Sequence, residues 1–226
     1  MCNGLSWIRR FDHKWYGDGR PFSLEISAFD LCRILIWSWI SALATTDWAA
    51  MRLVLLASGS GTLAQALIDA EFDIAAIVTD VPDAPVIERA KSAGIKTRVI
   101  PFVEPRLKWN QELFDCVNDL KPDLVVSVGF MRILNSDFVK RFKVINSHPA
   151  LLPNFPGAHA VKDALAAGVT ETGCTIHWID EGVDTGPVIA QMKIPVRTDD
   201  DVNSLHERIK IAERELIVKT VRNLGA

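Results

Sequence analysis

Three polar residues in the second half of the chain have side chains that could do chemistry together. Asn146 and His148 come at the end of an apolar run, and Asp184 lies on the connection between two later apolar runs. Because residues two apart on a strand face the same side, the side chains of Asn146 and His148 can enter one cleft. An amide stabilises an oxyanion, an imidazole moves protons, and a carboxylate raises the pKa of a neighbouring imidazole. The set therefore suits acyl transfer, and no serine elbow or activated cysteine accompanies it as a nucleophile.

A glycine-rich turn near residue 60 is a second candidate site. Gly59-Ser60-Gly61 separates an apolar run from a helical pattern, so backbone N–H groups and the positive end of a helix converge there, as phosphate binding requires. The stretch from Gly59 to Ala64 also fits GxGxxA, and Asp80 follows about 20 residues later, as in dinucleotide-binding folds. The turn alone leaves three alternatives open: a dinucleotide site, a site for the phosphate monoester of a smaller substrate, and a simple strand-to-helix turn.

From Met51 onward, the elements that must position these residues alternate between strands and helices. Strands are predicted at 52–57, 74–78, 97–102, 124–128 and 144–146, and helices at 62–70, 85–93, 106–120 and 136–142. The helix at 62–70 is expected to have a hydroxyl cap. Strands that are apolar on both faces imply a parallel sheet covered by helices on both sides. The fold class is therefore α/β, with a doubly wound, mostly parallel sheet.

The last third of the chain departs from this alternation. After a predicted helix at 160–167, strands at 174–179 and 188–194 are joined by a loop too short for a crossover helix. We therefore expect these two strands to form an antiparallel hairpin at the edge of the sheet. The acidic residues at 199–201 then begin a C-terminal helix with one apolar stripe.

Residues 1–50 differ in composition from the rest of the chain. Five of the seven tryptophans and the only tyrosine lie in this segment. The apolar run at 34–44 has half of the roughly 20 residues that a membrane-spanning helix needs, and its end resembles a secretory signal, but the residues before it include several acids. We expect 1–50 to be an extension, non-native or from a wrongly assigned start, with little independent fold, and 51–226 to be the catalytic domain.

Charge and cysteine content disfavour several classes of partner. The chain has 25 Lys and Arg against 28 Asp and Glu, with a net charge of −3 and no basic run, so a nucleic-acid role is not expected. The four cysteines form no CxxC pair, which argues against a zinc site and a disulfide framework. Cys116 and Cys174 are expected to be packing residues. We expect a cytoplasmic protein, monomeric or homodimeric, that binds no membrane and no metal.

Five motifs, in this order and spacing, together identify a family resemblance. They are Ser58–Thr62, Gly129–Leu134, Asn146–Pro153, Phe155–Gly157 and Asp184–Ile189. They resemble the phosphoribosylglycinamide formyltransferases of de novo purine synthesis, over Met51 to about Gly225. The resemblance implies a Rossmann-like formyltransferase fold and transfer of a formyl group from 10-formyltetrahydrofolate, as co-substrate, to the amine of glycinamide ribonucleotide. It also implies that the reaction uses no metal and no covalent enzyme intermediate.

The resemblance assigns a role to each of the three polar residues. His148 matches the catalytic proton donor, and Asn146 matches the group that binds the formyl oxygen. Asp184 matches the residue that keeps the imidazole protonated and relays a proton through water.

The resemblance also assigns residues to two substrate pockets. Gly61, Thr62 and Leu63 match the loop that holds the ribonucleotide phosphate, and Glu213 matches a residue that contacts the ribonucleotide. Many members have Asn where this chain has Leu63, so this contact is expected to come from the backbone. The residues that match the folate pocket are Arg106, Met131, Arg132, Ile133, Leu134, Asn146, Asp180, Glu181, Gly182 and Val183.

Other histidines and one arginine near these motifs have less specific interpretations. His177 lies among apolar residues of a predicted strand and is expected to be a hydrogen-bonded structural residue. His206 on the last helix is expected to be solvated, while His159 is left open between capping a helix and lining the cleft. For Arg132, which follows a buried strand, the backbone is expected to matter more than the charge.

Three alternative functions remain at this point. A methionyl-tRNA formyltransferase would carry a further RNA-binding domain, and a formyltetrahydrofolate hydrolase would carry a regulatory domain before the catalytic part. An NAD-dependent oxidoreductase or nucleotide-sensing module could use the Gly59 turn and Asp80, but this alternative leaves Asn146, His148 and Asp184 without a role.

Overall fold

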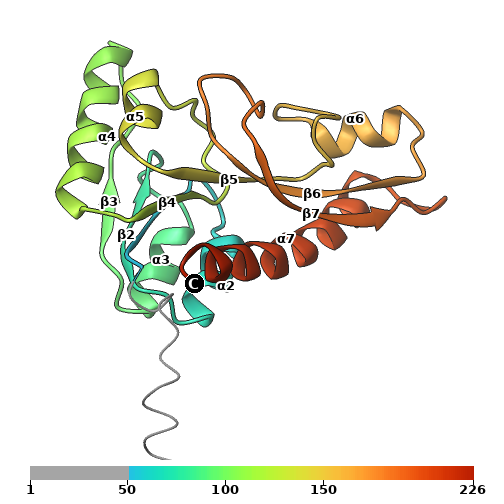
Figure 1. The fold of residues 1–226 in the computed structure, drawn as a ribbon, viewed down its shortest axis with the longest axis horizontal. Coiled ribbons are helices and arrows are strands. Elements are labelled where there is room, and N and C mark those ends of the chain that lie inside the picture. The colour runs from blue at the N-terminus through green and yellow to red at the C-terminus, as the bar shows by residue number, and fades with distance from the viewer. Residues whose placement is uncertain (1–50) are drawn as a thin grey trace, which may run out of the picture. The chain divides into compact units, whose positions relative to one another are not determined.

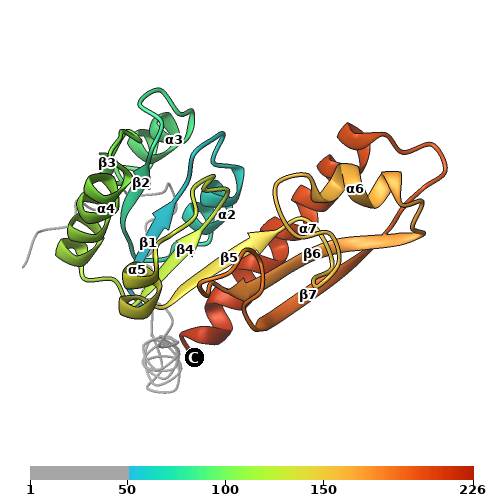
Figure 2. The ribbon, with the colours of Figure 1, turned by 90° about the horizontal axis from the view of Figure 1, so that it is seen from above.

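The computed structural model describes residues 51–226, which form a seven-stranded mixed sheet with helices on both faces (Figures 1 and 2). The elements are β1 (Leu53–Leu56), α2 (Thr62–Asp69), β2 (Ile74–Thr79), α3 (Val86–Ser92), β3 (Thr97–Val99), α4 (Arg106–Leu120), β4 (Leu124–Ser127), α5 (Ser136–Arg141), β5 (Val144–His148), α6 (Ala160–Ala166), β6 (Glu171–Trp178), β7 (Val188–Pro195) and α7 (Val202–Leu224). The expectation for 1–50 lies outside the described residues.

The strand order is β3-β2-β1-β4-β5-β6-β7, which confirms the doubly wound fold class. All pairs from β3 through β5 are parallel, whereas β6 pairs antiparallel with both β5 and β7. The predicted edge hairpin is therefore β6 and β7. The chain reverses its direction of winding between β1 and β4, and ligands of doubly wound sheets bind at the carboxyl ends of strands beside such a switch point.

The central strands have side chains packed into an apolar core on each face of the sheet. Leu53 and Leu55 of β1 belong to the core that α2 and α7 cover, whereas Val54 and Leu56 belong to the core that α4 and α5 cover. Figure 1 shows α4 and α5 on one side of the strands, to the left and upper left, and α2 and α7 on the other side, below β4 and β5. Burial on both faces explains why β1 and β4 are continuous apolar runs in the sequence.

Three strands differ in length from the sequence prediction because of their neighbours. β5 continues through His148, beyond the predicted end at residue 146, and β6 begins at Glu171 rather than at residue 174. Antiparallel pairing with β6 gives the polar end of β5 backbone partners, which the hydrophobic pattern does not record. β3 ends at Val99 instead of residue 102, because Val99 pairs with Thr79, the last residue of β2.

The start of α2 differs from the expected hydroxyl cap. The helix begins after Gly61, whose φ of 69° lies in the left-handed region that glycine adopts without strain, and among the described residues no side chain caps it. Gly61 also packs closely on α3, since a Cβ atom there would lie 2.3 Å from Cγ2 of Val86. The N–H groups of the first helical turn therefore remain available to a ligand.

None of the helices within residues 51–226 combines the length and the apolar character that crossing a bilayer requires.

Candidate active site

A cavity of about 340 Å³ opens at the carboxyl ends of β4 and β5. Its lining includes Asn146, His148 and Asp184, so the structure brings together the three residues for which the sequence predicts acyl-transfer chemistry. Asn146 and His148 come from β5, and Asp184 comes from the loop between β6 and β7. The cavity lies where a doubly wound sheet is expected to bind its ligand.

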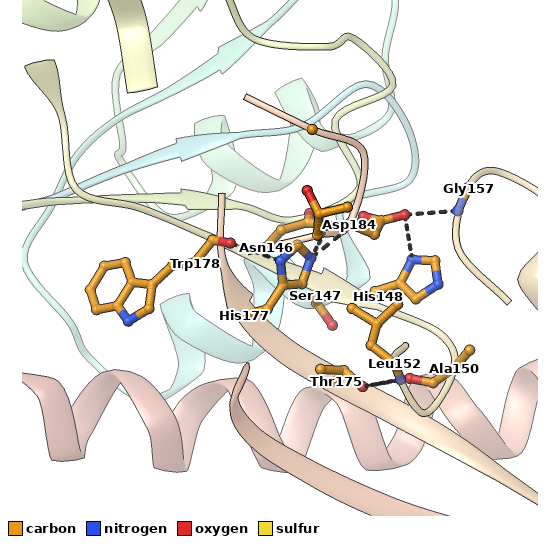
Figure 3. A network of polar contacts seen from close by, with 12 residues as sticks. Asn146, Ser147, His148, Ala150, Leu152, Gly157, Thr175, His177, Trp178 and Asp184 are labelled. Carbon is orange, nitrogen blue, oxygen red and sulfur yellow. Dashed lines mark hydrogen bonds and ion pairs between the residues drawn. The ribbon is translucent and has the colours of Figure 1, made fainter. Parts of the chain in front are cut away.

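His148 and Asp184 form a partly buried ion pair in the wall of this cavity (Figure 3). Nδ1 of His148 lies 3.3 Å from Oδ2 of Asp184, and the two side chains are 4% and 13% exposed. Nε2 of His148 lies 2.8 Å from the carbonyl oxygen of Phe155. Both ring nitrogens therefore face oxygen atoms that can accept a hydrogen bond.

The Asp184 carboxylate is held in its charged form by its neighbours. A hydrogen bond with His177 is the largest cause that lowers the pKa of Asp184, and the N–H of Gly157 and the charge of His148 act in the same direction, while burial opposes them. The Gly157 N–H donates to Oδ2 at 2.8 Å. Asp184 also has a φ of 55°, an uncommon left-handed conformation for a residue with a side chain. Such conformations concentrate where surrounding contacts fix a functional side chain.

His177 is a site residue that sequence reasoning assigned to structure alone. It lies opposite Asn146 in the β5–β6 ladder, and its Nε2 atom lies 3.3 Å from Nδ2 of Asn146 and 3.5 Å from Oδ1 of Asp184. Its Nδ1 atom lies 2.9 Å from the carbonyl oxygen of Trp178. In Figure 3 the amide and the carboxylate lie on one side of the His177 ring and the Trp178 carbonyl lies on the other. The contact arises from the antiparallel pairing of β6 with β5, which places His177 beside Asn146 and which the hydrophobic pattern of the sequence does not record.

Thr175 fixes the loop that leaves the active site after β5. Its Oγ1 atom donates to the carbonyl oxygen of Ala150 at 2.6 Å and accepts from the Leu152 N–H at 3.1 Å (Figure 3). Gln191 on β7 donates to Oγ1 of Thr175 at 2.9 Å and to the Leu152 carbonyl oxygen at 2.8 Å. One buried hydroxyl thus ties the residues after His148 to the edge hairpin.

Comparison with known proteins decides the family of the chain. The sequence pattern described as "Formyl transferase" matches residues 51–221. The chain belongs to the formyl transferase family. A phosphoribosylglycinamide formyltransferase of Mycobacterium tuberculosis is 44% identical over 185 residues, which cover 78% of this chain and 86% of the relative. The enzyme of that name from Escherichia coli (strain K12) is 36% identical over 176 residues, covering 74% of this chain and 83% of the relative.

Solved structures are similar to this formyl transferase over the same region. The crystal structure of phosphoribosylglycinamide formyltransferase from Streptococcus pneumoniae TIGR4 matches with a TM-score of 0.75 and 35% identity. The match covers 78% of this chain and 99% of that one. A glycinamide ribonucleotide transformylase 1 from Geobacillus kaustophilus matches with a TM-score of 0.74 and 37% identity, covering 78% and 99% of the two chains.

The loop expected to hold a phosphate lies outside the lining of the cavity. In this formyl transferase, Gly61 ends the β1–α2 turn, Thr62 and Leu63 begin α2, and Leu63 is only 9% exposed in the apolar core. A contact from Leu63 to a ligand would therefore come from its backbone. Asp80, which completes the dinucleotide pattern in the sequence, is 4% exposed and is hydrogen-bonded by Ser58. Its two carboxylate oxygens are bonded to Ser58 and Arg132, so protein groups take the place of the ribose hydroxyls that the dinucleotide pattern would require.

Glu213 connects α7 of the formyl transferase to the cavity through Ser147. The Ser147 hydroxyl donates to Oε1 of Glu213 at 2.6 Å, and Ser147 lines the cavity. Burial raises the pKa of Glu213, and the hydrogen bond from Ser147 and the charges of Lys210 and Arg214 reduce this shift. A buried acid beside the cavity is unusual for a structural helix residue.

The surroundings of His206, on the same helix, also differ from the sequence prediction. We expected it to be solvated, but it is partly buried and lines the cavity, and burial is the main cause that lowers its pKa.

The residues matched to folate lie in two segments along the cavity wall of the formyl transferase. Most of them line the cavity, namely Met131, Arg132, Ile133, Leu134, Asn146, Asp180, Gly182 and Val183. Met131, Ile133 and Val183 are 69%, 58% and 50% exposed, so apolar surface is available there. Arg106 and Glu181 lie outside the lining.

Arg106 and Glu181 nevertheless form hydrogen bonds or an ion pair with residues in the cavity wall or next to it. Arg106 donates to the Ile133 carbonyl oxygen at 2.7 Å, and Glu181 accepts from Ser136 at 2.8 Å and pairs with Lys140 at 2.9 Å. Each of them thus supports the position of a wall segment, Arg106 from α4 and Glu181 through α5.

The two cysteines of the described part of this formyl transferase have no sign of chemical activation. Cys174 is fully buried, and burial, with the charge of Glu213, raises the pKa of its thiol to about 12. Cys116 is partly buried on α4, and burial raises its pKa as well. Within residues 51–226, no three His, Cys, Asp or Glu residues are grouped so that they could hold a metal ion.

Proposed function

We propose that this formyl transferase moves the formyl group of 10-formyltetrahydrofolate to the amine of glycinamide ribonucleotide in purine biosynthesis. The products are N-formylglycinamide ribonucleotide and tetrahydrofolate. The observation that carries the proposal is the meeting of Asn146, His148 and Asp184 in one cavity with an exposed apolar wall beside them. Relatives that share 36–44% of their residues with the chain are named for this activity.

The proposed reaction is a direct attack of the amine on the formyl carbon. It gives a tetrahedral intermediate, and the Asn146 amide and the His148 ring donate hydrogen bonds to its oxyanion. A proton leaves the attacking amine, and a proton reaches the folate nitrogen as that nitrogen leaves. Asp184 would relay these protons through water, which is supported by the 3.3 Å between its carboxylate and His148 and by its lowered pKa, which favours the charged form. The steps need no metal and no covalent bond to the enzyme.

The hydrogen bonds of His148 determine how this ring meets the substrate. The Asp184 carboxylate contacts Nδ1 of His148, and the Phe155 carbonyl oxygen contacts Nε2. The substrate oxygen must replace the Phe155 carbonyl at Nε2 if His148 is to donate to it. Phe155 has a φ of 55°, and its replacement by the substrate would free the loop from part of this constraint.

The orientation of the Asn146 amide is set by His177. Nε2 of His177 faces both Asp184 and the Asn146 amide, and where it donates to Asp184 the nearer end of the amide must be its oxygen, because two donors cannot face each other in a hydrogen bond. The amide then turns its oxygen to His177 and its NH₂ group to the cavity; the two ends of an amide have nearly the same shape. In this orientation Asn146 is the oxyanion donor that the reaction needs.

The substrates are assigned to the two sides of the catalytic residues. The backbone of Gly61, Thr62 and Leu63 would take the ribonucleotide phosphate at the uncapped start of α2, and Glu213 would contact the ribonucleotide. The formyl folate would lie along the residues from Met131 to Leu134 and from Asp180 to Val183. Arg106 would support this pocket by its bond to Ile133.

The activity is tested with the purified full chain, glycinamide ribonucleotide and 10-formyltetrahydrofolate. We expect tetrahydrofolate to appear at the rate at which the formylated ribonucleotide forms, with no metal added. Release of formate without the ribonucleotide would instead make the chain a hydrolase, and tight binding of NAD without binding of the ribonucleotide would make it a dinucleotide-binding module. Either result would overturn the proposal.

The remaining assignments follow from this function. We place the enzyme in the cytoplasm, as a monomer or homodimer without nucleic-acid partners, and we assign catalysis to residues 51–226 alone. A chain that begins at Met51 should therefore show the same kcat as the full chain.

A further inference from the structure

Asp80 is a buried acid that the proposed reaction does not use. It follows the last residue of β2, and its side chain is 1% exposed. Its Oδ1 accepts from the Ser58 hydroxyl at 2.5 Å, and its Oδ2 pairs with Nε of Arg132 at 2.6 Å. A carboxylate buried to this degree needs partners of this kind, because burying an unpaired charge is costly. The two partners come from segments that lie far apart in the sequence.

Both partners of Asp80 also hold the segment Gly129–Leu134, which forms part of the cavity wall. The Ser58 hydroxyl accepts from the Met131 N–H at 2.9 Å, and the Ser58 N–H donates to the Gly129 carbonyl at 3.1 Å. Arg132 belongs to the segment itself. The Asp80 carboxylate is therefore linked to this segment in two ways, directly by its ion pair with Arg132 and indirectly by its hydrogen bond with Ser58.

The Arg132 guanidinium is fixed on a second side by an aromatic ring. Its Cζ atom lies 4.4 Å from the centre of the Phe102 ring, within the range of a cation–π interaction. Arg106 lies 6.0 Å from the same ring and donates to the Ile133 carbonyl. The ion pair and the ring thus fix Arg132, whose neighbours Met131 and Ile133 are the exposed apolar residues of the segment.

We propose that Asp80 is a positioning residue for the formyl folate. It holds Arg132 and Ser58 so that Met131 and Ile133 keep the shape of the folate wall, and it joins this wall to the turn that begins after Ser58. The inference rests on the proposed assignment of residues 131–134 to the folate. It also gives a use to the acid that the sequence pattern would assign to a ribose.

A carboxylate fits this position better than an amide. Ser58 and Arg132 both bring a donor to Asp80, and only a carboxylate offers acceptors to both with a charge that matches the guanidinium. In Asp80→Asn one end of the side chain is an NH₂ group, which is a donor and cannot accept the hydrogen bond that Ser58 or Arg132 brings to that end. We expect the KM for 10-formyltetrahydrofolate to rise roughly tenfold, in line with the loss of a hydrogen bond to a charged group. The KM for glycinamide ribonucleotide should change by less than threefold.

The experiment compares Asp80→Asn and Arg132→Gln with Asp83→Asn, which changes an exposed acid three residues further along the chain. We would measure both KM values, kcat, the thermal midpoint and the affinity for tetrahydrofolate by calorimetric titration. Both variants at the site should raise the KM for 10-formyltetrahydrofolate and lower the affinity for tetrahydrofolate. The variant that carries both substitutions should bind tetrahydrofolate no more weakly than the single variant with the lower affinity, because the two side chains act as a pair. The control should behave as the wild type.

Several outcomes would overturn the inference. Unchanged folate KM and tetrahydrofolate affinity in Asp80→Asn, with or without a lower thermal midpoint, would leave Asp80 a purely structural residue. Additive losses in the double variant would show that Arg132 acts without Asp80. If Asp80→Asn does not fold, Arg132→Lys decides instead, because it keeps a positive charge beside the buried carboxylate but removes the Nε donor, and an unchanged affinity for tetrahydrofolate in that variant would overturn the inference. The titration is read without turnover, so a wild type that binds tetrahydrofolate but does not formylate the ribonucleotide would overturn the proposed function and not this inference.

Discussion

His177 lies directly opposite Asn146 across the β5–β6 ladder, with 3.3 Å between its Nε2 atom and the amide nitrogen. The same Nε2 atom lies 3.5 Å from Asp184, so one imidazole connects the proposed oxyanion donor to the proposed proton relay. The His177 ring is 2% exposed, and its Nδ1 atom is bonded to a carbonyl of its own strand. It has little freedom to turn, and it therefore sets the position of both neighbours.

Replacement of His177 should lower turnover without changing the affinity for substrates. We expect His177→Asn to reduce kcat by about 10- to 100-fold, the range expected when a reacting group is slightly misplaced. Asn can replace Nδ1 in the bond to Trp178 but cannot reach Asn146 or Asp184. His177→Gln places its amide near the position of Nε2 and should retain more activity. Steady-state kinetics with both substrates measures the difference.

The control for His177 is His159→Ala, because His159 is exposed at the start of α6 and lies outside the cavity lining. Equal activity of the Asn and Gln variants would contradict a positioning role, since the two differ in which ring nitrogen they replace.

Asn146→Ala should remove one oxyanion donor. We expect kcat to fall by about 10²- to 10³-fold, as in other enzymes that lose such a donor, with little change in the affinity for the ribonucleotide. Single-turnover rates, together with equilibrium titration of the ribonucleotide, would separate the two effects. Asn203→Ala, at an exposed amide in the first turn of α7, is the matched control. A normal single-turnover rate in Asn146→Ala would remove this residue from the mechanism.

The hydrophobic pattern of the sequence predicted the fold because the sheet is buried on both faces. Leu53 to Leu56 are all buried, and such a run has few alternatives to a central parallel strand. The ends of elements were predicted less well where a neighbouring strand decides them. His148 belongs to a strand because β6 pairs with it, and this partner is formed by residues more than twenty positions later.

The candidate site was predicted where its residues belong to sequence motifs and missed where tertiary contacts create it. Asn146, His148 and Asp184 were found from their types and surroundings. His177 was taken as structural because it alternates with apolar residues, and only its pairing partner shows its place in the site. The use of the Arg132 charge was missed for the same reason, since its partner Asp80 lies 52 residues away in the sequence.

Asp184→Asn should make the stability of the protein less dependent on pH. The pKa of Asp184 is lower in the folded chain than its ordinary value of about 3.9, so the folded state binds fewer protons at this group. The resulting stability is full above the unfolded pKa and is lost as the pH falls through the folded pKa. Thermal midpoints between about pH 5 and pH 3 should therefore fall more steeply in the wild type than in the variant.

Activity provides a second measurement for Asp184→Asn. Without the carboxylate, His148 loses the negative charge 3.3 Å from its Nδ1, and kcat should fall across the whole pH range. Asp199→Asn, at an exposed acid before α7, is the control. Stability profiles of equal slope in the wild type and Asp184→Asn would contradict the ionised, hydrogen-bonded carboxylate.

Thr175→Val should destabilise the fold through the loop after His148. The substitution keeps the shape of the side chain but removes the oxygen that serves Ala150, Leu152 and Gln191. Leaving such buried groups without a partner costs about 1–3 kcal/mol in the free energy of unfolding. Urea unfolding would measure this loss, provided that the m-value is unchanged.

The same strand offers a matched control for Thr175. Thr172 is 1% exposed, and its hydroxyl oxygen has no hydrogen-bond partner among the described residues. Thr172→Val should therefore be neutral or stabilising, because it removes a buried polar group that gains nothing from folding. Equal losses in the two variants would show that shape, and not the hydrogen bonds of Thr175, limits stability.

Glu213→Gln should stabilise the protein at high pH and weaken ribonucleotide binding. Burial raises the pKa of Glu213 above its ordinary value of about 4.3, so the folded state binds more protons at this group than the unfolded state does. Its contribution to stability is therefore largest below the unfolded pKa and is lost as the pH rises through the folded pKa. The variant has no proton to lose, while its amide oxygen can still accept from Ser147. Its thermal midpoint should exceed that of the wild type at pH 8 by more than at pH 4.5.

The KM for glycinamide ribonucleotide tests the functional side of Glu213. If the carboxylate accepts hydrogen bonds from the ribonucleotide, Glu213→Gln should raise this KM and leave the KM for 10-formyltetrahydrofolate unchanged. Glu215→Gln changes an exposed acid two residues further along α7 and should alter neither the KM values nor the thermal midpoints. A stabilised variant with an unchanged ribonucleotide KM would make Glu213 a buried acid without a substrate contact. A rise in the ribonucleotide KM together with the gain in stability would mean that the enzyme keeps a destabilising charge because its substrate needs it.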